Sequence, residues 1–407
     1  MNKKMDRYYH TLLNNELVEN RQMAFVSGAR QVGKTTLAKQ ISQLFQSALY
    51  LNWDDTEHRQ LILGETKDLV ETLGLNQLQT SPPLLILDEI HKYSQWKTFL
   101  KGLFDRFEGK LVILVTGSAQ LTVFKKGGDS LMGRYFNYRL HPFSVAELTH
   151  SDWKMNQLIQ PPQFLEEESY AHLLQFGGFP EPFLKANPRF YHRWRRLRQQ
   201  QLVREEIRDV ARIQEIAQLE MLVILLEKQA GQVTKYTTLA KQLRVSVDTV
   251  RRWLDVLEGF YYCYRIRPWH QNITTALRKE PKTYLWDWSC ISDRGAKAEN
   301  FIASHLLKAV HAWTDVGLGD FDLYYLRTKD QKEVDFLVTR NQKPWFLVEV
   351  KSAMKAALNP HLAWFKMKTG ADSAFQVVMD ADFVNADCFQ HTTPIKVPAR
   401  TFLSQLV

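Results

Sequence analysis

Residues 28–35 read Gly28-Ala29-Arg30-Gln31-Val32-Gly33-Lys34-Thr35, followed by Thr36. They fit the pattern G-x-x-x-x-G-K-[ST] at every fixed position. The preceding residues 22–27 predict a strand, and residues 34–45 predict a helix. A glycine-rich turn at a helix N-terminus presents backbone N–H groups to phosphate oxygens. The stretch therefore predicts an ATP site in which residues 28–36 bind the nucleotide, Lys34 reaches the β- and γ-phosphates and Thr35 holds Mg²⁺.

A second apolar run ends in two adjacent carboxylates, Asp88 and Glu89, directly after residues 84–87. A carboxylate at such a strand end holds the Mg²⁺ shell, which predicts a metal role for Asp88. Glu89 is then placed to orient or deprotonate the attacking water. A kinase for small molecules needs no water-activating glutamate. The pair therefore favours ATP hydrolysis and makes a small-molecule kinase the weakest alternative.

A third polar strand end follows residues 111–115 and reads Thr116-Gly117-Ser118. In a parallel P-loop sheet this strand lies beside the first, so its polar end faces the γ-phosphate. We expect Ser118 to sense the γ-phosphate, with Thr116 as the alternative. Hydroxyls at strand ends also form turns, which is the other interpretation of both residues.

The chain as a whole alternates apolar strands with helices in its first part, as parallel α/β folds do. After Pro142 the pattern is mostly helical to about residue 228, and a helix-turn-helix signal follows over 234–258. Strands return in the C-terminal part and predict an antiparallel group. They cover residues 322–327, 332–338 and 345–351, with a turn over 341–344 before the last of them.

The composition is that of a soluble globular protein of two to four domains, with 407 residues, 45% hydrophobic and 24% charged. No apolar run approaches the roughly 20 residues of a membrane-spanning helix. The N-terminal residues show no secretory signal, and the three scattered cysteines fit a reducing compartment. We therefore expect a cytoplasmic protein without a membrane partner.

The charge balance is compatible with nucleic acid binding, because the net charge is +9. The densest basic cluster lies within residues 189–198. It is either a patch for a phosphate backbone or the solvated face of a helix. The helix-turn-helix segment would place Thr249, Arg251 and Arg252 in a major groove. Asp248 and Asp255 on the same helix would repel phosphate, so this segment is alternatively a packing module.

A group of charged residues marks the C-terminal part. Glu349 and Lys351 lie two apart on one predicted strand and share a face. Pairing with the preceding strand brings Asp335 beside them, while Glu299 approaches from a helix. Carboxylates of this kind hold a divalent metal, and the lysine stabilises a hydroxide or an attacked phosphate. Glu333 on the same face is either a further ligand or a solvated neighbour.

These motifs together resemble AAA-like ATPases that carry a C-terminal domain of unknown function related to restriction-type nucleases. The resemblance continues beyond the nucleotide site through motifs spread over much of the chain. They read Leu131-Met132-Gly133-Arg134, His141-Pro142-Phe143-Ser144 and Gly177-Gly178-Phe179-Pro180-Glu181-Pro182.

The resemblance implies further roles. Arg134 stands where such proteins place an arginine that reaches a γ-phosphate, within the subunit or from a neighbour. Action from a neighbour would require a dimer or a ring, that is, a homo-oligomer. Gly178 and Pro180 look like the glycine-x-proline element of a lid whose proline packs against adenine, although a turn explains them equally. Glu299, Asp335, Glu349 and Lys351 resemble a PD-(D/E)xK nuclease site.

The expected architecture is an α/β chain of four parts. These are a P-loop AAA-like parallel-sheet ATPase domain (1–145), a helical lid (146–230), a winged helix-turn-helix (231–280) and a restriction-nuclease-like α/β domain (281–407). The first functional hypothesis is an ATP- and Mg²⁺-dependent hydrolase that acts on DNA, with a metal-dependent nuclease site. The second is a nucleotide-switched regulatory ATPase whose nuclease-like domain only recognises a partner, such as a protein.

Overall fold

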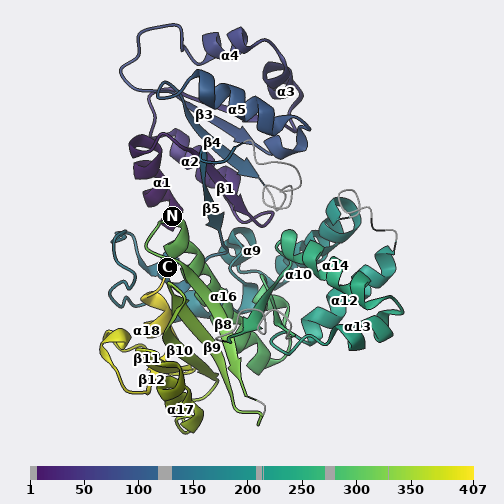
Figure 1. The fold of residues 1–407 in the computed structure, drawn as a ribbon, viewed down its shortest axis with the longest axis vertical. Coiled ribbons are helices and arrows are strands. Elements are labelled where there is room, and N and C mark those ends of the chain that lie inside the picture. The colour runs from purple at the N-terminus through teal and green to yellow at the C-terminus, as the bar shows by residue number, and fades with distance from the viewer. Residues whose placement is uncertain (1–6, 118–130, 208–212, 214, 271–279, 329) are drawn as a thin grey trace. The chain divides into compact units, whose positions relative to one another are not determined.

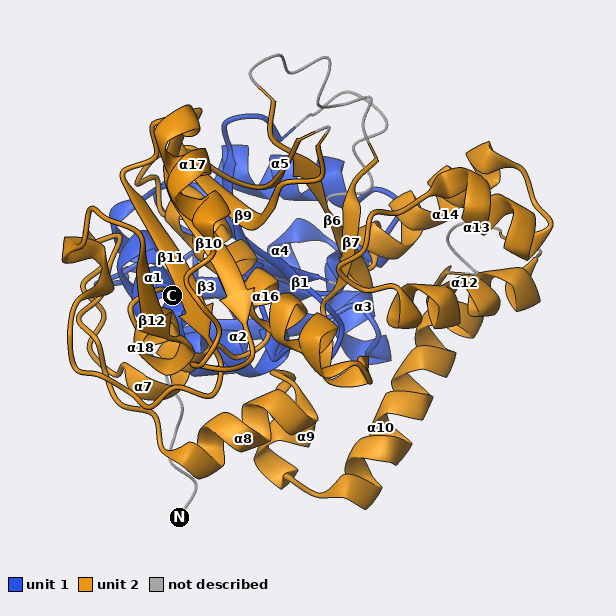
Figure 2. Cartoon of the chain, turned by 90° about the horizontal axis from the view of Figure 1, so that it is seen from below, with its two compact units in different colours: residues 1–141 blue, residues 142–407 orange. Residues whose placement is uncertain are grey.

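The computed structural model describes residues 1–407 except 1–6, 118–130, 208–212, 214, 271–279 and 329. The chain divides into two compact units, Met1–His141 and Pro142–Val407, which Figure 2 colours separately. Each unit contains a β-sheet with helices packed against it. Every helix in the described ranges is too short or too polar to span a bilayer.

The first unit is built on a parallel sheet of five strands in the order β2-β3-β4-β1-β5 (Figure 1). The strands are β1 (Met23–Gly28), β2 (Ala48–Asn52), β3 (Leu84–Asp88), β4 (Val112–Gly117) and β5 (Tyr135–Leu140). The strands predicted over residues 22–27, 84–87 and 111–115 are confirmed as β1, β3 and β4, with ends shifted by one or two residues. The sequence does not predict β5, because this edge strand is only partly buried and mixes polar with aromatic residues.

Helices cover both faces of this sheet. On one face, Trp96 and Leu100 pack in one cluster with Leu85 and Leu87. On the other, Leu37 and its buried neighbours face the strands without joining that cluster. Burial on both faces explains why the inner strands read as continuous apolar runs. The described residues of this unit include the helices α1 (Tyr8–Glu19), α2 (Lys34–Ser42), α3 (Thr56–Leu63), α4 (Thr66–Thr72), η1 (Ile90–Lys92) and α5 (Trp96–Arg106).

The second unit is built on a seven-stranded mixed sheet in the order β12-β11-β10-β9-β8-β6-β7. Its strands are β6 (Cys263–Pro268), β7 (Lys282–Leu285), β8 (Phe321–Arg327), β9 (Glu333–Arg340), β10 (Lys343–Lys351), β11 (Ser373–Val378) and β12 (Ile395–Pro398). The predicted antiparallel group is confirmed as β8, β9 and β10. Strands β11 and β12 extend the sheet in parallel from β10.

Two helices pack against the centre of this sheet. Helix α16 (Arg294–Asp315) contacts β8, β9 and β10, and most of its inward residues are fully buried. Helix α17 (Pro360–Thr369) places Leu362 and Phe365 in a cluster with Leu337 and Leu347. That cluster contains no residue of α16, so the two helices cover different parts of the sheet.

The hairpin between β9 and β10 is tighter than the sequence suggests. Asn341 and Gln342 both have positive φ values, 50° and 64°. Two consecutive left-handed residues are typical of a two-residue hairpin turn. The predicted turn over 341–344 is therefore too long, because Lys343 and Pro344 already belong to β10.

The predicted helix-turn-helix segment does form two helices, α13 (Tyr236–Leu243) and α14 (Val247–Gly259). Ser246 caps the second helix by accepting a 3.0 Å hydrogen bond from Thr249 N. The strand that follows is not a free wing. It is β6, which pairs with both β7 and β8 and so belongs to the seven-stranded sheet. The winged-helix description stays a prediction.

The mostly helical character of residues 146–230 is confirmed. This region contains α7 (Val145–Thr149), α8 (Glu167–Phe176), α9 (Pro180–Lys185), α10 (Pro188–Gln200), the π-helix η2 (Gln201–Ile207) and α12 (Ile216–Lys228). It is continuous with the rest of the second unit, because α7 packs on the C-terminal helix α18 (Ala399–Ser404). Lys308 of α16 also pairs with buried Glu147 of α7. The three segments predicted after residue 145 therefore form one compact unit.

Candidate functional site

The phosphate-binding loop connects β1 to α2, as the motif predicts. Gly33 has φ = 102°, a left-handed conformation that favours glycine. A Cβ on Gly28 would lie 2.4 Å from the carbonyl oxygen of Leu140, so only glycine fits beside β5. The ammonium of Lys34 is buried and donates to the carbonyls of Gly28 and Ala29, each at 2.9 Å. The loop is thus folded around the lysine that the motif assigns to phosphate.

The other predicted loop residues divide into two groups. Ala29 and Val32 are buried and anchor the loop. The side chains of Arg30, Gln31, Thr35 and Thr36 lie on the exposed side of the loop and of the first turn of α2.

An arginine that sequence reasoning missed supports the same loop. Arg7 is buried, and its Nη1 donates to the Val32 carbonyl at 3.1 Å. Its Nη2 donates to the carbonyl of His141. Arg7 precedes the first predicted element and belongs to no motif, so the sequence carries no signal for this contact. It connects the phosphate loop to residues before α1 and after β5.

The carboxylate of Asp88 is the point at which several elements meet. The Thr35 hydroxyl of α2 donates to its Oδ2 at 2.8 Å, and the Tyr50 hydroxyl of β2 donates to the same oxygen at 2.6 Å. The Thr116 hydroxyl of β4 donates to Oδ1. Tyr50 was not expected from the sequence. Its hydroxyl has a raised pKa because it is buried next to Asp88, so it remains a hydrogen-bond donor at neutral pH.

Strand order explains this convergence. Strand β4 lies between β1 and β3, and its register sets Thr116 beside Asp88 and Gly117 beside Ser27. The carboxyl ends of parallel strands lie at one edge of a sheet, so the phosphate loop, Asp88 and Thr116 share that edge. Ser118, the preferred candidate for sensing the γ-phosphate, lies outside the described residues. Thr116, the alternative, contacts Asp88.

Glu89 occupies an unusual backbone position directly after β3. Its φ is 57°, which is rare for residues other than glycine. Its backbone N–H donates to the Thr116 carbonyl at 3.0 Å. Burial raises the pKa of the Glu89 carboxyl, and the ammonium groups of Lys34 and Lys92 oppose that rise. A carboxylate with a raised pKa in a phosphate site has the properties of a general base.

His91 lies beside Glu89, with Nε2 3.5 Å from Glu89 Oε2. Burial lowers the pKa of His91 to about 4. The imidazole is therefore neutral at neutral pH. His91 therefore supplies no positive charge to Glu89 at neutral pH.

The residues at this edge fit a magnesium nucleotide. Mg²⁺ in nucleotide sites is held by one or two protein oxygens together with phosphate oxygens. The Thr35 hydroxyl and the Asp88 carboxylate are 2.8 Å apart and supply these protein oxygens. The predicted metal roles of both residues are compatible with this geometry.

Arg134 lies away from this edge. Strand β5 runs parallel to β1, with Met23 beside Tyr135 and Gly28 beside Leu140. Arg134 is therefore at the opposite end of the strands, about 16 Å along the sheet at 3.3 Å per residue. Its guanidinium makes two hydrogen bonds to Asp105, of 2.7 and 3.1 Å. The predicted action of Arg134 on a γ-phosphate within its own subunit is wrong, and action from a neighbouring subunit stays a prediction.

The lid motif has a packing role in the second unit. A Cβ on Gly178 would lie 2.6 Å from the Phe143 carbonyl and 2.7 Å from the ring of Trp288. The Gly178 carbonyl accepts a 2.7 Å hydrogen bond from Phe143 N. Pro180 is the first residue of α9, a position that needs no backbone N–H. A contact of Pro180 with adenine stays a prediction.

The C-terminal charged group does assemble. Glu349 and Lys351 lie on one face of β10, with Lys351 Nζ 2.7 Å from Glu349 Oε1. Asp335 of β9 accepts a 2.8 Å hydrogen bond from Val350 N. Burial raises the pKa of Asp335, and the nearby carboxylates of Glu299 and Glu349 add to the rise. The four residues that the sequence singles out are therefore neighbours in space.

This group does not fit a metal ion as the side chains stand. Among the residues that the structure describes, no three or more His, Cys, Asp or Glu side chains are grouped to hold a metal. The carboxylates are occupied by protein donors instead. Lys282, which sequence reasoning missed, lies 3.1 Å from Glu299 and 2.6 Å from Glu333. Metal binding at Glu299, Asp335 and Glu349 stays a prediction.

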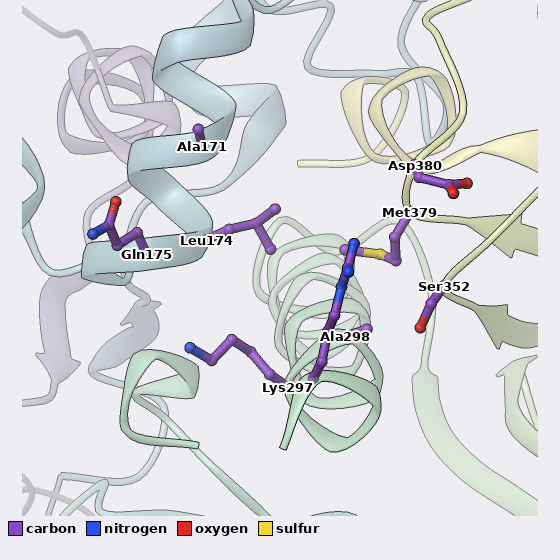
Figure 3. A pocket seen from close by; sticks show the side chains of 9 residues that line it. Ala171, Leu174, Gln175, Lys297, Ala298, Ser352, Met379 and Asp380 are labelled. Carbon is purple, nitrogen blue, oxygen red and sulfur yellow. The ribbon is translucent and has the colours of Figure 1, made fainter. Parts of the chain in front are cut away.

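A cavity of about 390 Å³ lies elsewhere in the second unit, between α8 and the start of α16 (Figure 3). Leu174 approaches it from α8 and Lys297 from α16. Ser352, Met379 and Asp380 close it from the ends of β10 and β11. None of the predicted charged residues of β9 and β10 lines this cavity.

Part of the charge on the helix-turn-helix is paired, while Arg252 is exposed on α14. Arg251 lies 3.3 Å from Asp248 of the same helix. Arg265 of β6 lies 2.6 Å from Asp255. These pairs reduce the positive charge that the predicted major-groove contacts require.

The fold and the first site define a P-loop nucleotide-binding protein, and comparison with known families agrees. Residues 20–149 match the family described as "AAA domain". The first unit is therefore an AAA-like P-loop domain. Residues 167–293 match the "Domain of unknown function (DUF8612)", and residues 294–396 match the "Domain of unknown function (DUF4143)".

Similar proteins occur in bacteria and archaea. An uncharacterized protein of Haemophilus influenzae is 21% identical over 83% of this chain and 83% of its own length. One of Mycobacterium tuberculosis is 25% identical over 79% of this chain and 69% of its own length. One of Methanocaldococcus jannaschii is 23% identical over 69% of this chain and 65% of its own length.

Two solved structures align with this chain at low TM-scores. A Walker-type ATPase of Pyrococcus abyssi aligns with a TM-score of 0.43 and 13% identity, covering 70% of this chain and 93% of that one. AMPPCP-bound DnaA of Aquifex aeolicus aligns with a TM-score of 0.32 and 14% identity, covering 61% and 86%. The assignment of the first unit rests on the family match and on the site geometry.

Proposed function

We propose that this chain hydrolyses ATP at the edge where β1, β3 and β4 end. The observation that carries the proposal is the hydrogen bond from Thr35 to Asp88. It brings the phosphate loop and the acidic strand end to one point, with Glu89 next in the chain. A site that only bound phosphate would need the loop but not the two carboxylates.

Each residue has a task in this proposal. Lys34 and the loop N–H groups bind the phosphates, and Thr35 and Asp88 hold Mg²⁺, which neutralises phosphate charge when it is bound. Glu89 accepts the proton of the attacking water. Its raised pKa makes it a stronger base than an exposed glutamate. Arg134 of a neighbouring subunit would stabilise the developing charge in a homo-oligomer.

DNA is the proposed partner, and helix α10 is the proposed contact surface. Arg189, Arg193 and Arg196 are exposed and recur at helical spacing along one face of α10. Arg195 on another side pairs with Glu227 at 2.7 Å. A stripe of exposed arginines suits a phosphate backbone. The paired charges around α14 make that helix the weaker choice.

Two functions of the second unit, cleavage of DNA and recognition without cleavage, are compatible with an ATPase that acts on DNA. Metal-dependent cleavage is favoured by the gathering of Asp335, Glu349 and Lys351, the residues through which this chain resembles a PD-(D/E)xK site. Recognition without cleavage is favoured by Lys282, which pairs with Glu299, and by Lys351, which pairs with Glu349. We propose recognition as the output, with cleavage as the second candidate.

The experiment measures ATP turnover with Mg²⁺, alone and with single-stranded, duplex or branched DNA that is labelled and also analysed on a gel. We expect DNA to raise turnover and to remain uncut. The double variant Arg193→Glu/Arg196→Glu should lose the stimulation and keep the basal rate. The matched control Lys101→Glu/Arg106→Glu makes the same charge change on exposed positions of α5.

The outcomes separate the candidates. Cleavage that Glu349→Ala abolishes would establish the nuclease. Turnover that ignores every DNA would point to the switch hypothesis with a protein partner. Absence of turnover under all conditions would contradict ATP hydrolysis itself.

A further inference from the structure

The side chains of Glu299, Glu333, Asp335 and Glu349 form an acidic group in the second unit, and a buried lysine lies within it. Lys282 is the first residue of β7, and only 4% of its surface is exposed. Its Nζ lies 2.6 Å from Glu333 Oε1 and 3.1 Å from Glu299 Oε1. It also lies 5.5 Å from the centre of the Tyr325 ring. A buried ammonium is stable only with such partners.

One oxygen of Glu299 and one of Glu349 already accept hydrogen bonds from protein donors. Glu299 Oε1 accepts from the Tyr284 hydroxyl at 2.7 Å as well as from Lys282. Glu349 Oε1 accepts from Lys351 at 2.7 Å and from Asn359 Nδ2 at 2.8 Å. Each of these oxygens therefore has two donors.

An ammonium that bridges two carboxylates, as Lys282 bridges Glu299 and Glu333, competes with a divalent cation for them. Mg²⁺ requires oxygen ligands at about 2.0–2.1 Å. An ammonium within hydrogen-bond distance of the same carboxylate would lie a few ångströms from the metal, and the repulsion between them is large in a buried site. Lys282 itself is buried, and it cannot withdraw into solvent without leaving the partly buried carboxylates of Glu299 and Glu333 without this partner.

We infer that Lys282 is a built-in counter-ion that takes the place of a divalent metal among Glu299, Glu333 and Asp335. Lys282 then balances the charge of these carboxylates, and the nuclease-like domain does not bind Mg²⁺ or Mn²⁺ at these residues. This inference does not depend on ATP hydrolysis. It agrees with the proposal that the domain recognises its partner without cutting it.

The test is a titration of the full-length chain with Mn²⁺, followed by electron paramagnetic resonance without nucleotide. An Asp88→Asn background removes the metal ligand of the ATP site. In this background we expect no Mn²⁺ binding that depends on the acidic group, so adding Asp335→Asn changes nothing. This comparison leaves Lys282 untouched and does not depend on whether a Lys282 variant folds.

The second arm replaces Lys282 by Met in the same background. Removal of one positive charge a few ångströms from a dication should tighten Mn²⁺ binding by about tenfold or more. The gain should disappear again when Glu299→Gln is added. The control Lys343→Met removes an exposed lysine at the other end of β10, and it should show no gain.

Two results would overturn the inference. One is Mn²⁺ binding by the chain with Lys282 intact that Asp335→Asn removes. The other is a folded Lys282→Met variant that binds Mn²⁺ no more tightly than its parent. Folding of each variant is checked by circular dichroism before the titration.

Discussion

The hydroxyl of Thr35 donates a 2.8 Å hydrogen bond to the carboxylate of Asp88 and so connects α2 to the end of β3. These residues are 53 positions apart in the chain. Their contact depends on β4, which lies between β1 and β3 and adds Thr116 to the same carboxylate. The relationship turns two separate sequence motifs into one site.

Tyr50 should position Asp88 for magnesium nucleotide. Tyr50→Phe removes one hydrogen bond to an ionised group, which is worth about 1.5–3 kcal/mol. Because the bond holds a metal ligand, we expect the KM for MgATP to rise by about tenfold and kcat to change less. Steady-state kinetics measure both. Tyr93→Phe is the control, since that hydroxyl contacts only Gln95 at 3.4 Å on the exposed surface; equal effects of both changes would argue against the role.

Glu89 should set the acid limb of the pH profile of kcat. Burial raises the pKa of its carboxyl above the ordinary value, and a general base works only when deprotonated. Turnover should therefore fall as the pH drops through this raised pKa. Lys92→Met removes a positive charge that lowers the pKa, so the limb should move to higher pH. Lys67→Met, in an exposed pair with Glu65, should leave it in place. A limb that does not respond to Lys92→Met would assign it to another group.

Arg134 should act only between subunits. Its position beside the start of β1 separates it from its own phosphate loop by the length of the strand. We expect Arg134→Ala to bind ATP normally and to lose turnover by about a hundredfold or more. Mixing it with Lys34→Ala should restore part of the activity, because each variant supplies what the other lacks. Full activity of Arg134→Ala alone would contradict a role in turnover, and the pairing with Asp105 would then be a structural contact.

His305 should make the second unit sensitive to acid. Its imidazole is buried in α16, and Nε2 accepts a 3.1 Å hydrogen bond from Val145 N. Burial lowers its pKa from 6.5 to about 3. The unfolded chain therefore binds a proton that the folded chain does not, and stability falls as the pH drops below 6.5. At about pH 5 the loss is about 2 kcal/mol.

Urea unfolding at about pH 7 and pH 5 measures this loss, with tryptophan fluorescence reporting on Trp288 beside His305. His305→Gln cannot be protonated and should flatten the difference. His391→Gln, at an exposed position, should not. An unchanged difference in His305→Gln would contradict the role.

Sequence patterns predicted the elements that carry strong local signals. The phosphate loop, the three inner strands β1, β3 and β4 and the Asp88-Glu89 pair have fixed spacing or continuous apolar runs, because two-sided burial and phosphate geometry constrain them. The neighbourhood of Asp335 and Glu349 also followed from strand pairing.

Contacts between residues that are distant in the chain and belong to no motif could not be predicted from the sequence. Arg7, Tyr50 and Lys282 are ordinary residues whose roles arise from tertiary packing. The expectation that Arg134 could reach the γ-phosphate of its own subunit was wrong for a related reason. The sequence does not predict β5, so the direction of that strand and the end at which Arg134 lies could not be inferred.

The most direct test compares ATP binding with phosphate release in three proteins: the unchanged chain, Lys34→Ala and Glu89→Gln. Binding is followed by calorimetry and hydrolysis by release of inorganic phosphate, both with Mg²⁺. We expect the unchanged chain to bind and hydrolyse, Lys34→Ala to lose binding, and Glu89→Gln to bind but to lose turnover by about a hundredfold or more. Hydrolysis that persists in Glu89→Gln, or binding that persists unchanged in Lys34→Ala, would contradict the site described for this chain.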